Sequence, residues 1–167
     1  MKKITVEEIM KLDPCYTEEK VKDLIGKGKT PLEILDLPIS KSDKFWLLLR
    51  PKYISEKRLH LLACDFAQDV AHMNPDPRVQ AAIDAKRLWI DGKITDEELK
   101  KARAAAYAAD AADAATYAAY AAYAATYAAD AADAASSAAS AADVDINIGT
   151  KQIEMVRKVF IDMGEIK

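Results

Sequence analysis

The alanine-rich stretch at residues 104–143 constrains the fold of this chain more than any other feature. It reads AAAYAADAADAATYAAYAAYAATYAADAADAASSAASAAD. Alanine has the highest helix propensity, and neither glycine nor proline occurs between Lys93 and Ile148. Together with the capping box at residues 95–98, where the helix is expected to begin, the stretch predicts one helix of about 48 residues, roughly 72 Å long. Because this exceeds the width of a compact domain, we expect the helix to protrude, to assemble with other copies, or to bend near Ser136 and Ser137.

Large side chains recur every three residues within this stretch, with one extra residue in every ten. This pattern spirals around a helix, although the rings from Tyr117 to Tyr127 share one arc of about 120°. The pattern is nearly palindromic, so two antiparallel copies would match ring with ring, although aspartate would then face aspartate. The same rings have two other interpretations. They could fill the space between alanine-coated helices, or they could line a surface that binds a ligand or a partner. We predict a homo-oligomer interface formed by Tyr117, Tyr120, Ala121, Ala122, Tyr123 and Tyr127.

Signals for helix starts and stops divide the remainder of the chain into short segments. The N-caps that we predict are Thr5, Thr17, Thr30, Ser55, Asp76, Thr95 and Thr150. The dense apolar run at residues 45–49 is expected to be buried on nearly all sides. No hairpin signal or sustained alternation occurs, so the predicted fold class is all-α, a helical bundle with one long alanine-rich helix. We assign most of the core to residues 1–103, the long helix to 104–143, and a C-terminal amphipathic helix to 150–164.

Charge and cysteine content narrow the expected environment of the protein. The net charge of −3 gives no overall footprint for nucleic acid or an anionic membrane, and Lys and Arg are absent from residues 104–150. Cys15 and Cys64 form no C-x-x-C motif, so we expect free thiols in a reducing cytosol. The first residues lack the apolar segment of a signal peptide, and the alanine-rich stretch is too polar to span a membrane. We therefore expect a cytoplasmic protein, in the host cytoplasm if the chain is phage-encoded.

Two sets of side chains suggest catalytic or metal chemistry, and both have a simpler interpretation. His60 and Cys64 share a helix face, but zinc requires four ligands and no third is evident. We interpret them as a partly exposed histidine and a core thiol. Asp65, Asp69 and Asp84 have no spacing that fixes an acid–base pair, and they are more typical of solvated or salt-bridged surface acids. We predict that the protein is not an enzyme and requires no metal or cofactor.

A set of basic residues gives a more specific hypothesis, because several lie at helix starts or beside aromatic residues. Arginine makes bidentate contacts to phosphate, and a tyrosine ring stacks on a base. The residues that we predict to bind an anionic nucleotide are Arg50, Lys52, Arg58, Arg87, Arg103 and Tyr107. The wider basic set also contains Lys44, Lys57, Arg78, Lys86, Lys100 and Lys101. Ordinary surface charge, paired with neighbouring Glu and Asp, explains the same residues without a ligand.

Several segments resemble one known family. They are LDPCY, FWLLLR, RLHLLACDFAQDV, DPRVQAAIDAKRLWIDGKITDEELKKARAAAYAA and KQIEMVRKVF, together with the YAA/DAA repeat. These segments resemble the alanine-rich α-helical immunity protein family of bacteria and tailed phages, over almost the whole chain. The most specific part is ACDFAQDV followed by W-x-x-G-x-I-T-x-E-E-L. The resemblance implies a helical, non-enzymatic protein of genetic conflict, and it carries over no individual site residue.

Three functional hypotheses remain open at this point. In the first, a phage-type anti-defence protein forms a homo-oligomer that sequesters a small, cyclic nucleotide signal or blocks a host defence protein. In the second, an immunity protein neutralises a toxin by direct contact, with the acidic, tyrosine-rich stretch facing a basic toxin surface. In the third, the chain is a purely structural helical oligomer. No membrane partner and no sequence-specific nucleic acid is expected in any of them.

Overall fold

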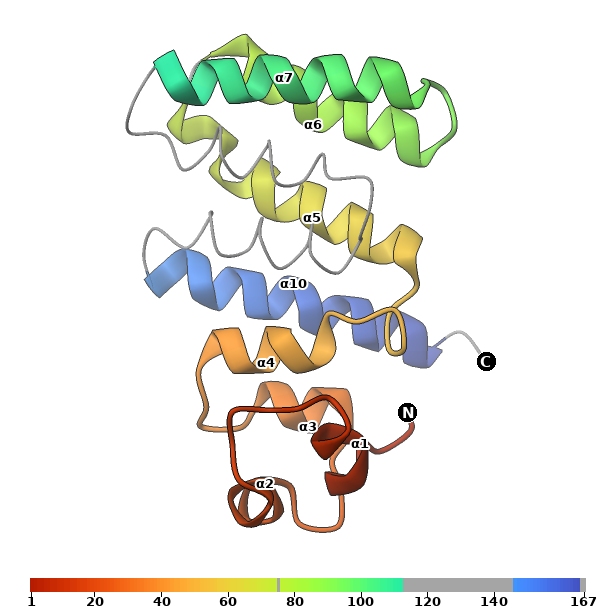
Figure 1. Ribbon diagram of the computed structural model, residues 1–167, viewed down its shortest axis with the longest axis vertical. Helices are drawn as coiled ribbons and strands as arrows, with labels where there is room; N and C mark the ends of the chain where they lie inside the picture. The colour runs from red at the N-terminus through yellow and green to blue at the C-terminus, as the bar shows by residue number, and fades with distance from the viewer. Residues whose placement is uncertain (75, 113–145, 166–167) are drawn as a thin grey trace. The chain divides into compact units, whose positions relative to one another are not determined.

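The computed structural model describes residues 1–74, 76–112 and 146–165 (Figure 1). These residues form helices and no β-strand, apart from one antiparallel bridge between Ile4 and Lys29. The prediction of an all-α fold is therefore confirmed. Within the same residues, no helix combines the length and the apolar character that a bilayer crossing requires.

The chain divides into two compact units. The first unit contains Met1–Leu48 and Val156–Lys167, and the second contains Leu49–Met155. The helices of the first unit are α1 (Val6–Met10), α2 (Glu18–Ile25), α3 (Pro31–Leu35), α4 (Lys41–Leu48) and the C-terminal part of α10 (Ile146–Glu165). The helices of the second unit are α5 (Glu56–Val70), η1 (Ala71–Met73), α6 (Pro77–Ile90), α7 (Asp96–Ala112) and the N-terminal part of α10.

Each unit has its own buried aliphatic and aromatic side chains. In the first unit, Ile34, Leu48 and Phe160 are almost fully buried. The Arg157 guanidinium also donates to the Asp36 carboxylate at 2.6 Å, which ties α10 to the end of α3. In the second unit, the apolar face of α5 is buried along its length, with Phe66 at its centre. Burial of these faces is the main term that stabilises such short helices.

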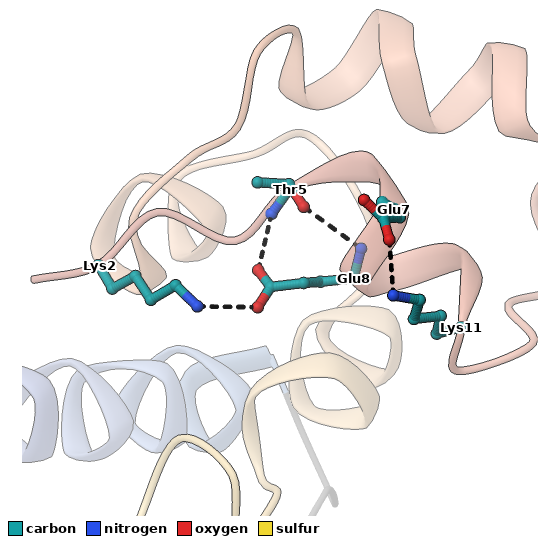
Figure 2. A network of polar contacts seen from close by, with 5 residues as sticks. All are labelled: Lys2, Thr5, Glu7, Glu8 and Lys11. Carbon is teal, nitrogen blue, oxygen red and sulfur yellow. Dashed lines mark hydrogen bonds and ion pairs between the residues drawn. The ribbon is translucent and has the colours of Figure 1, made fainter.

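Capping boxes begin the helices at the predicted threonines, as Figure 2 shows for α1. The Thr5 backbone N–H donates to the Glu8 carboxylate at 3.2 Å, and the Glu8 N–H donates to the Thr5 hydroxyl at 3.3 Å. Lys2 forms an ion pair with Glu8, and Lys11 forms one with Glu7 (Figure 2). Thr30 and Thr95 begin α3 and α7 in the same way, and the side chains of Thr17 and Asp76 cap α2 and α6.

Three local predictions need correction. Ser55 precedes α5 but makes no side-chain capping bond. The last helix begins at Ile146, so Gly149 and Thr150 lie within it and Thr150 is not its N-cap. Gly149 is buried there, and packing offsets the cost of about 1 kcal/mol that glycine carries in a helix interior. Trp46, in the dense apolar run, is 38% exposed, whereas its neighbours Phe45 and Leu47 are buried.

The alanine-rich helix is described only at its beginning. Helix α7 continues from the capping box at Thr95 into the alanine-rich stretch as far as Ala112. The predicted interface at Tyr117, Tyr120, Ala121, Ala122, Tyr123 and Tyr127 lies outside the described residues, and so does the predicted bend near Ser136 and Ser137. Self-association through this stretch therefore stays a prediction.

Candidate functional site

The outward face of α7 carries the predicted ligand-binding residues that the structure brings together. Lys100, Arg103, Ala104 and Tyr107 follow one another at intervals of three, one and three residues, which places all four on one side of the helix. They line a pocket with a volume of about 330 Å³, which we call the α7 pocket. Arg103 and Tyr107 belong to the set predicted from the sequence, whereas Lys100 belonged only to the wider basic set.

The orientation of this face follows from the way α7 is anchored. The capping box fixes the first turn, because Thr95 and Glu98 exchange hydrogen bonds at 2.8 and 3.3 Å. The backbone N–H and the hydroxyl of Thr95 both donate to the Glu98 carboxylate, at 2.8 and 2.9 Å, and they lower the pKa of Glu98. The carboxylate therefore stays charged beside the helix N-terminus. Leu99 and Ala106, seven residues apart, are fully or almost fully buried on the side packed against α6. Lys100 and Tyr107 each follow one of these two residues by one position, so they lie about 100° around the helix from the buried side.

The chemistry of the α7 pocket is that of anion binding and ring stacking. The Arg103 guanidinium offers planar, paired N–H donors, and the Lys100 ammonium adds a second positive charge. The Tyr107 ring is 56% exposed, which leaves much of its surface to stack on a flat group. The small Ala104 methyl between them lets such a group approach the helix closely. No Ser, Thr, Cys, His, Asp or Glu is among the described residues that line this pocket.

Four other predicted residues do not line the α7 pocket. Arg87 donates to the Asp65 carboxylate at 2.9 Å, as the surface-charge interpretation expected. Lys52 places its ammonium 5.4 Å from the centroid of the neighbouring Tyr53 ring. Arg50 lies in the connection between α4 and α5, and Arg58 lies half-buried in the first turn of α5. The described residues that line the pocket are thus all from α7.

Lys86 departs most from the prediction for the basic set. Its residue is 0% exposed, and its ammonium lies 4.0 Å from the centroid of the Trp89 ring, a cation–π distance. Burial lowers the pKa of Lys86 to about 8, because desolvation penalises the charged form. Lys86 follows Val79, Ala82 and Ile83 at helical spacing, so its register on the apolar face of α6 was a signal in the sequence.

The surroundings of Trp89 hold this part of α6 in place. The indole Nε1–H donates to the Asp96 carboxylate at 2.6 Å, which links the end of α6 to the start of α7. The His60 ring meets the Trp89 ring edge-on, with centroids 5.3 Å apart. His60 was expected to be partly exposed, and it is buried instead by this contact. Arrangements of this kind stabilise the packing of α5, α6 and α7.

The predicted core thiol is confirmed. Cys64 is fully buried, and burial raises the pKa of its thiol to about 11, so the neutral form persists at ordinary pH. In the described part of the chain, no group of three or more His, Cys, Asp and Glu side chains gathers as a metal site would require. Asp65 is a surface acid that pairs with Arg87, as predicted, and the exposed Asp84 accepts a hydrogen bond from Gln80. The prediction is wrong for Asp69, because its side chain is only 5% exposed although it pairs with Lys151.

Comparison with known proteins adds no constraint to the site. No family model, no curated protein and no solved structure matches the chain. The resemblance to the immunity protein family therefore stays a prediction.

Proposed function

We propose that this chain is a non-enzymatic binding protein that sequesters a small anionic nucleotide, in the manner of a phage anti-defence protein. The observation that carries the proposal is the α7 pocket, where Lys100, Arg103 and Tyr107 share one helix face. Two of these three residues were predicted from the sequence to bind such a ligand. The proposal requires binding alone, and a signalling nucleotide held by an abundant protein is removed from its receptor without any chemical step.

The geometry supports a nucleotide better than a simple anion. Phosphate oxygens match the paired donors of Arg103, and the nearby ammonium of Lys100 adds attraction at short range. A base that stacks on the Tyr107 ring would contribute about 1–3 kcal/mol, independently of the phosphate contacts. A volume of about 330 Å³ accommodates one nucleotide unit, since ligand pockets start at roughly 300 Å³. A larger, cyclic ligand would extend beyond the described residues.

Titration calorimetry tests this proposal directly. We would titrate the full chain with cyclic dinucleotides, cyclic trinucleotides and nucleotide–ribose compounds, at low salt and at about 0.15 M salt, where the Debye length is about 8 Å. We expect at least one of these compounds to bind, with an affinity that weakens as salt increases because the cations are exposed. If none binds, and none shifts the melting temperature, sequestration is wrong. Recovery of one stoichiometric basic protein from lysate would then favour the toxin-neutralising alternative.

Matched variants separate the pocket from general surface charge. Arg103→Gln removes a charged hydrogen-bond donor, and we expect it to weaken binding by about tenfold to a hundredfold. Tyr107→Ala removes the stacking surface, and we expect a loss of about tenfold. Lys101→Gln changes the net charge as Arg103→Gln does, but from a neighbouring position on another side of α7. Equal losses for Lys101→Gln and Arg103→Gln would contradict a site at this face.

A further inference from the structure

The first unit contains a second cavity, which the proposed function does not use. Its volume is about 380 Å³, and residues between Ile9 and Leu47 line it. We call it the N-terminal cavity. Its walls are mostly aliphatic, from side chains such as Val21, Leu24 and Ile34, and the half-exposed Trp46 contributes an aromatic surface. Among the described residues that line it, there is no Lys, Arg or His. An apolar pocket with a few polar groups is the usual form of a small-molecule site.

The polar groups of the N-terminal cavity are mainly acceptors with negative charge. The carboxylates of Asp13 and Asp43 both belong to its lining. The Tyr16 hydroxyl donates to Asp43 Oδ2 at 2.8 Å, and the Ser40 hydroxyl donates to the same oxygen at 2.6 Å. Within the described residues, Oδ1 of Asp43 accepts no hydrogen bond. The bond to Asp43 raises the pKa of Tyr16, so the phenol stays a neutral donor.

The backbone that carries Asp13 is also specialised. Asp13 has φ of 54°, in the left-handed region, and it is the only residue other than glycine with a positive φ in the described part of the chain. Pro14 follows it and prevents α1 from continuing. Aspartate tolerates this conformation better than most residues, and strained positions of this type cluster at ligand sites. The turn brings Asp13 and Cys15 to the lining of the same cavity as Asp43.

We propose that the N-terminal cavity binds a small amphiphilic amine, whose apolar body occupies the aliphatic walls and whose protonated amine donates to the carboxylates of Asp43 and Asp13. The charge of the lining selects this occupant. A carboxylate or phosphate would meet two negative charges with no cation to offset them, and such like-charge contacts cost several kcal/mol. A protonated amine instead supplies three donors where the free oxygen of Asp43 can accept one. This inference is independent of the α7 pocket and of its ligand.

The volume of the N-terminal cavity limits the size of the apolar part of the proposed amine. A cavity of about 150 Å³ lined by aliphatic and aromatic side chains holds one benzene molecule. The N-terminal cavity, at about 380 Å³, therefore has room for a ring together with a short chain that reaches the carboxylates. An arylalkylamine is the simplest probe with these features. The same ring with a terminal methyl group tests the contribution of the walls alone.

Cys15 makes the proposal testable by disulfide capture. It is exposed and lines the cavity, whereas the other thiol, Cys64, is buried with a pKa of about 11 and serves as an unreactive internal control. Three aryl disulfide fragments, identical except for a terminal amine, methyl or carboxylate, would be equilibrated with the protein at increasing concentrations of reductant. Intact mass spectrometry measures the captured fraction. We expect the amine fragment to withstand about ten times more reductant than the carboxylate fragment.

Controls distinguish a cavity from a merely acidic surface. Cysteamine carries the amine without the ring, and we expect it to lose most of the preference. Asp43→Asn and Asp13→Asn keep the shape of each side chain and should each reduce the preference for the amine by threefold or more, as roughly expected for one screened charge contact. Asp23→Asn makes the same change of net charge on the exposed side of α2 and should have no effect.

A noncovalent measurement completes the test. In a Trp89→Phe background, Trp46 is the sole tryptophan, and phenethylamine should change its fluorescence while phenylacetate should not. Leu24→Phe places a larger ring in the wall and should abolish both the capture preference and the fluorescence change. Two results would overturn the proposal. One is equal capture of the amine and carboxylate fragments by the wild type. The other is a full amine preference with cysteamine, or a loss of the preference in Asp23→Asn as large as the loss in Asp43→Asn.

Discussion

The N-terminal cavity and the α7 pocket have similar volumes, about 380 and 330 Å³, but they present opposite charges to a ligand. The carboxylates of the cavity come from the turn after α1 and from the first turn of α4, where a helix N-terminus favours negative charge. The cations of the α7 pocket lie beyond the first turn of α7, and their spacing places them on one side of the helix. The charge of each site thus follows from a different local feature: a turn and a helix start for the acids, and helical spacing for the cations.

The two sites also differ in their exposure to solvent. The walls of the N-terminal cavity include Ile34 and Val21, which are almost fully buried, so a ligand there gains apolar contacts. The α7 pocket is bounded by the exposed ring of Tyr107 and by the cationic side chains of Lys100 and Arg103, so a ligand there gains mainly charge contacts and stacking. Salt should therefore weaken binding at the α7 pocket more than at the cavity.

The largest expected effect comes from destabilising one unit at a time. Phe66→Ala removes a fully buried ring from the second unit, and we expect a loss of about 3–5 kcal/mol in the free energy of unfolding of that unit. Amide hydrogen exchange in α5 and α6 should accelerate, whereas α2 and α3 should stay protected. Phe160→Ala is the matched change in the first unit, and it should reverse this pattern. Equal acceleration in both units for either variant would show that the two sites share one cooperative unit.

Local chemistry in the sequence predicted the helix starts, because a capping box involves only residues three apart. The boxes at Thr5, Thr30 and Thr95 needed no knowledge of tertiary structure. The N-terminal cavity was not predicted, because each wall residue has the pattern of an ordinary core position. A cavity depends on the space that neighbours leave unfilled, and the Tyr16–Asp43 bond spans 27 residues.

The candidate site was predicted in part, for a related reason. Arg103 and Tyr107 are one helical turn apart, so their proximity follows from the sequence. Arg87 was equally plausible from the sequence, but Asp65 lies 22 residues away along the chain and only the packing of α5 against α6 brings the two together. A similar limit explains Lys86, whose long apolar stem can lie inside a core while its charge meets the Trp89 ring.

Charge reversal at the α7 pocket tests whether the two sites bind their ligands independently. Arg103→Glu replaces a cation by an anion, and we expect nucleotide affinity to fall by about a hundredfold or more, because a favourable charged contact becomes a repulsive one. Capture of the amine fragment at Cys15 should not change. Calorimetry and the capture assay on the same sample provide the two readings. A parallel loss in both assays would indicate unfolding and would break the distinction between the sites.

A smaller effect is expected from the turn that carries Asp13. Asp13→Val places a β-branched residue at a positive φ, and we expect a loss of about 1–2 kcal/mol in the free energy of unfolding of the first unit. Asp13→Asn should stay within about 0.5 kcal/mol of the wild type, because asparagine tolerates the same conformation. Urea denaturation measures both differences. Similar stabilities for the two variants would mean that the turn does not require a left-handed residue.

The smallest predicted effect concerns pH and the buried Lys86. Its pKa falls from 10.5 in the unfolded chain to about 8 in the folded protein, so between these values the unfolded state binds more protons. Stability must then rise with pH as the solution passes through 8, and the penalty of the buried charge is fully present below that pH. The raised pKa of Cys64 acts in the opposite direction above pH 9. We therefore expect a net gain of about 1 kcal/mol between pH 7.5 and 9, measured by urea denaturation.

Removal of Lys86 identifies the source of this pH dependence. Lys86→Met fills a similar volume without a titratable group, so the rise between pH 7.5 and 9 should disappear. Lys101→Met, at an exposed position of α7, should retain the rise in full. Asp96 lies close enough to favour the charged form of Lys86, so Asp96→Asn should lower the pKa of Lys86 further and move the rise to lower pH. If the free energy of unfolding depends on pH in the same way for the wild type and Lys86→Met, the Lys86 ammonium is hydrated in the folded protein. Lys86 would then resemble the solvated cations of α7, and not a buried charge.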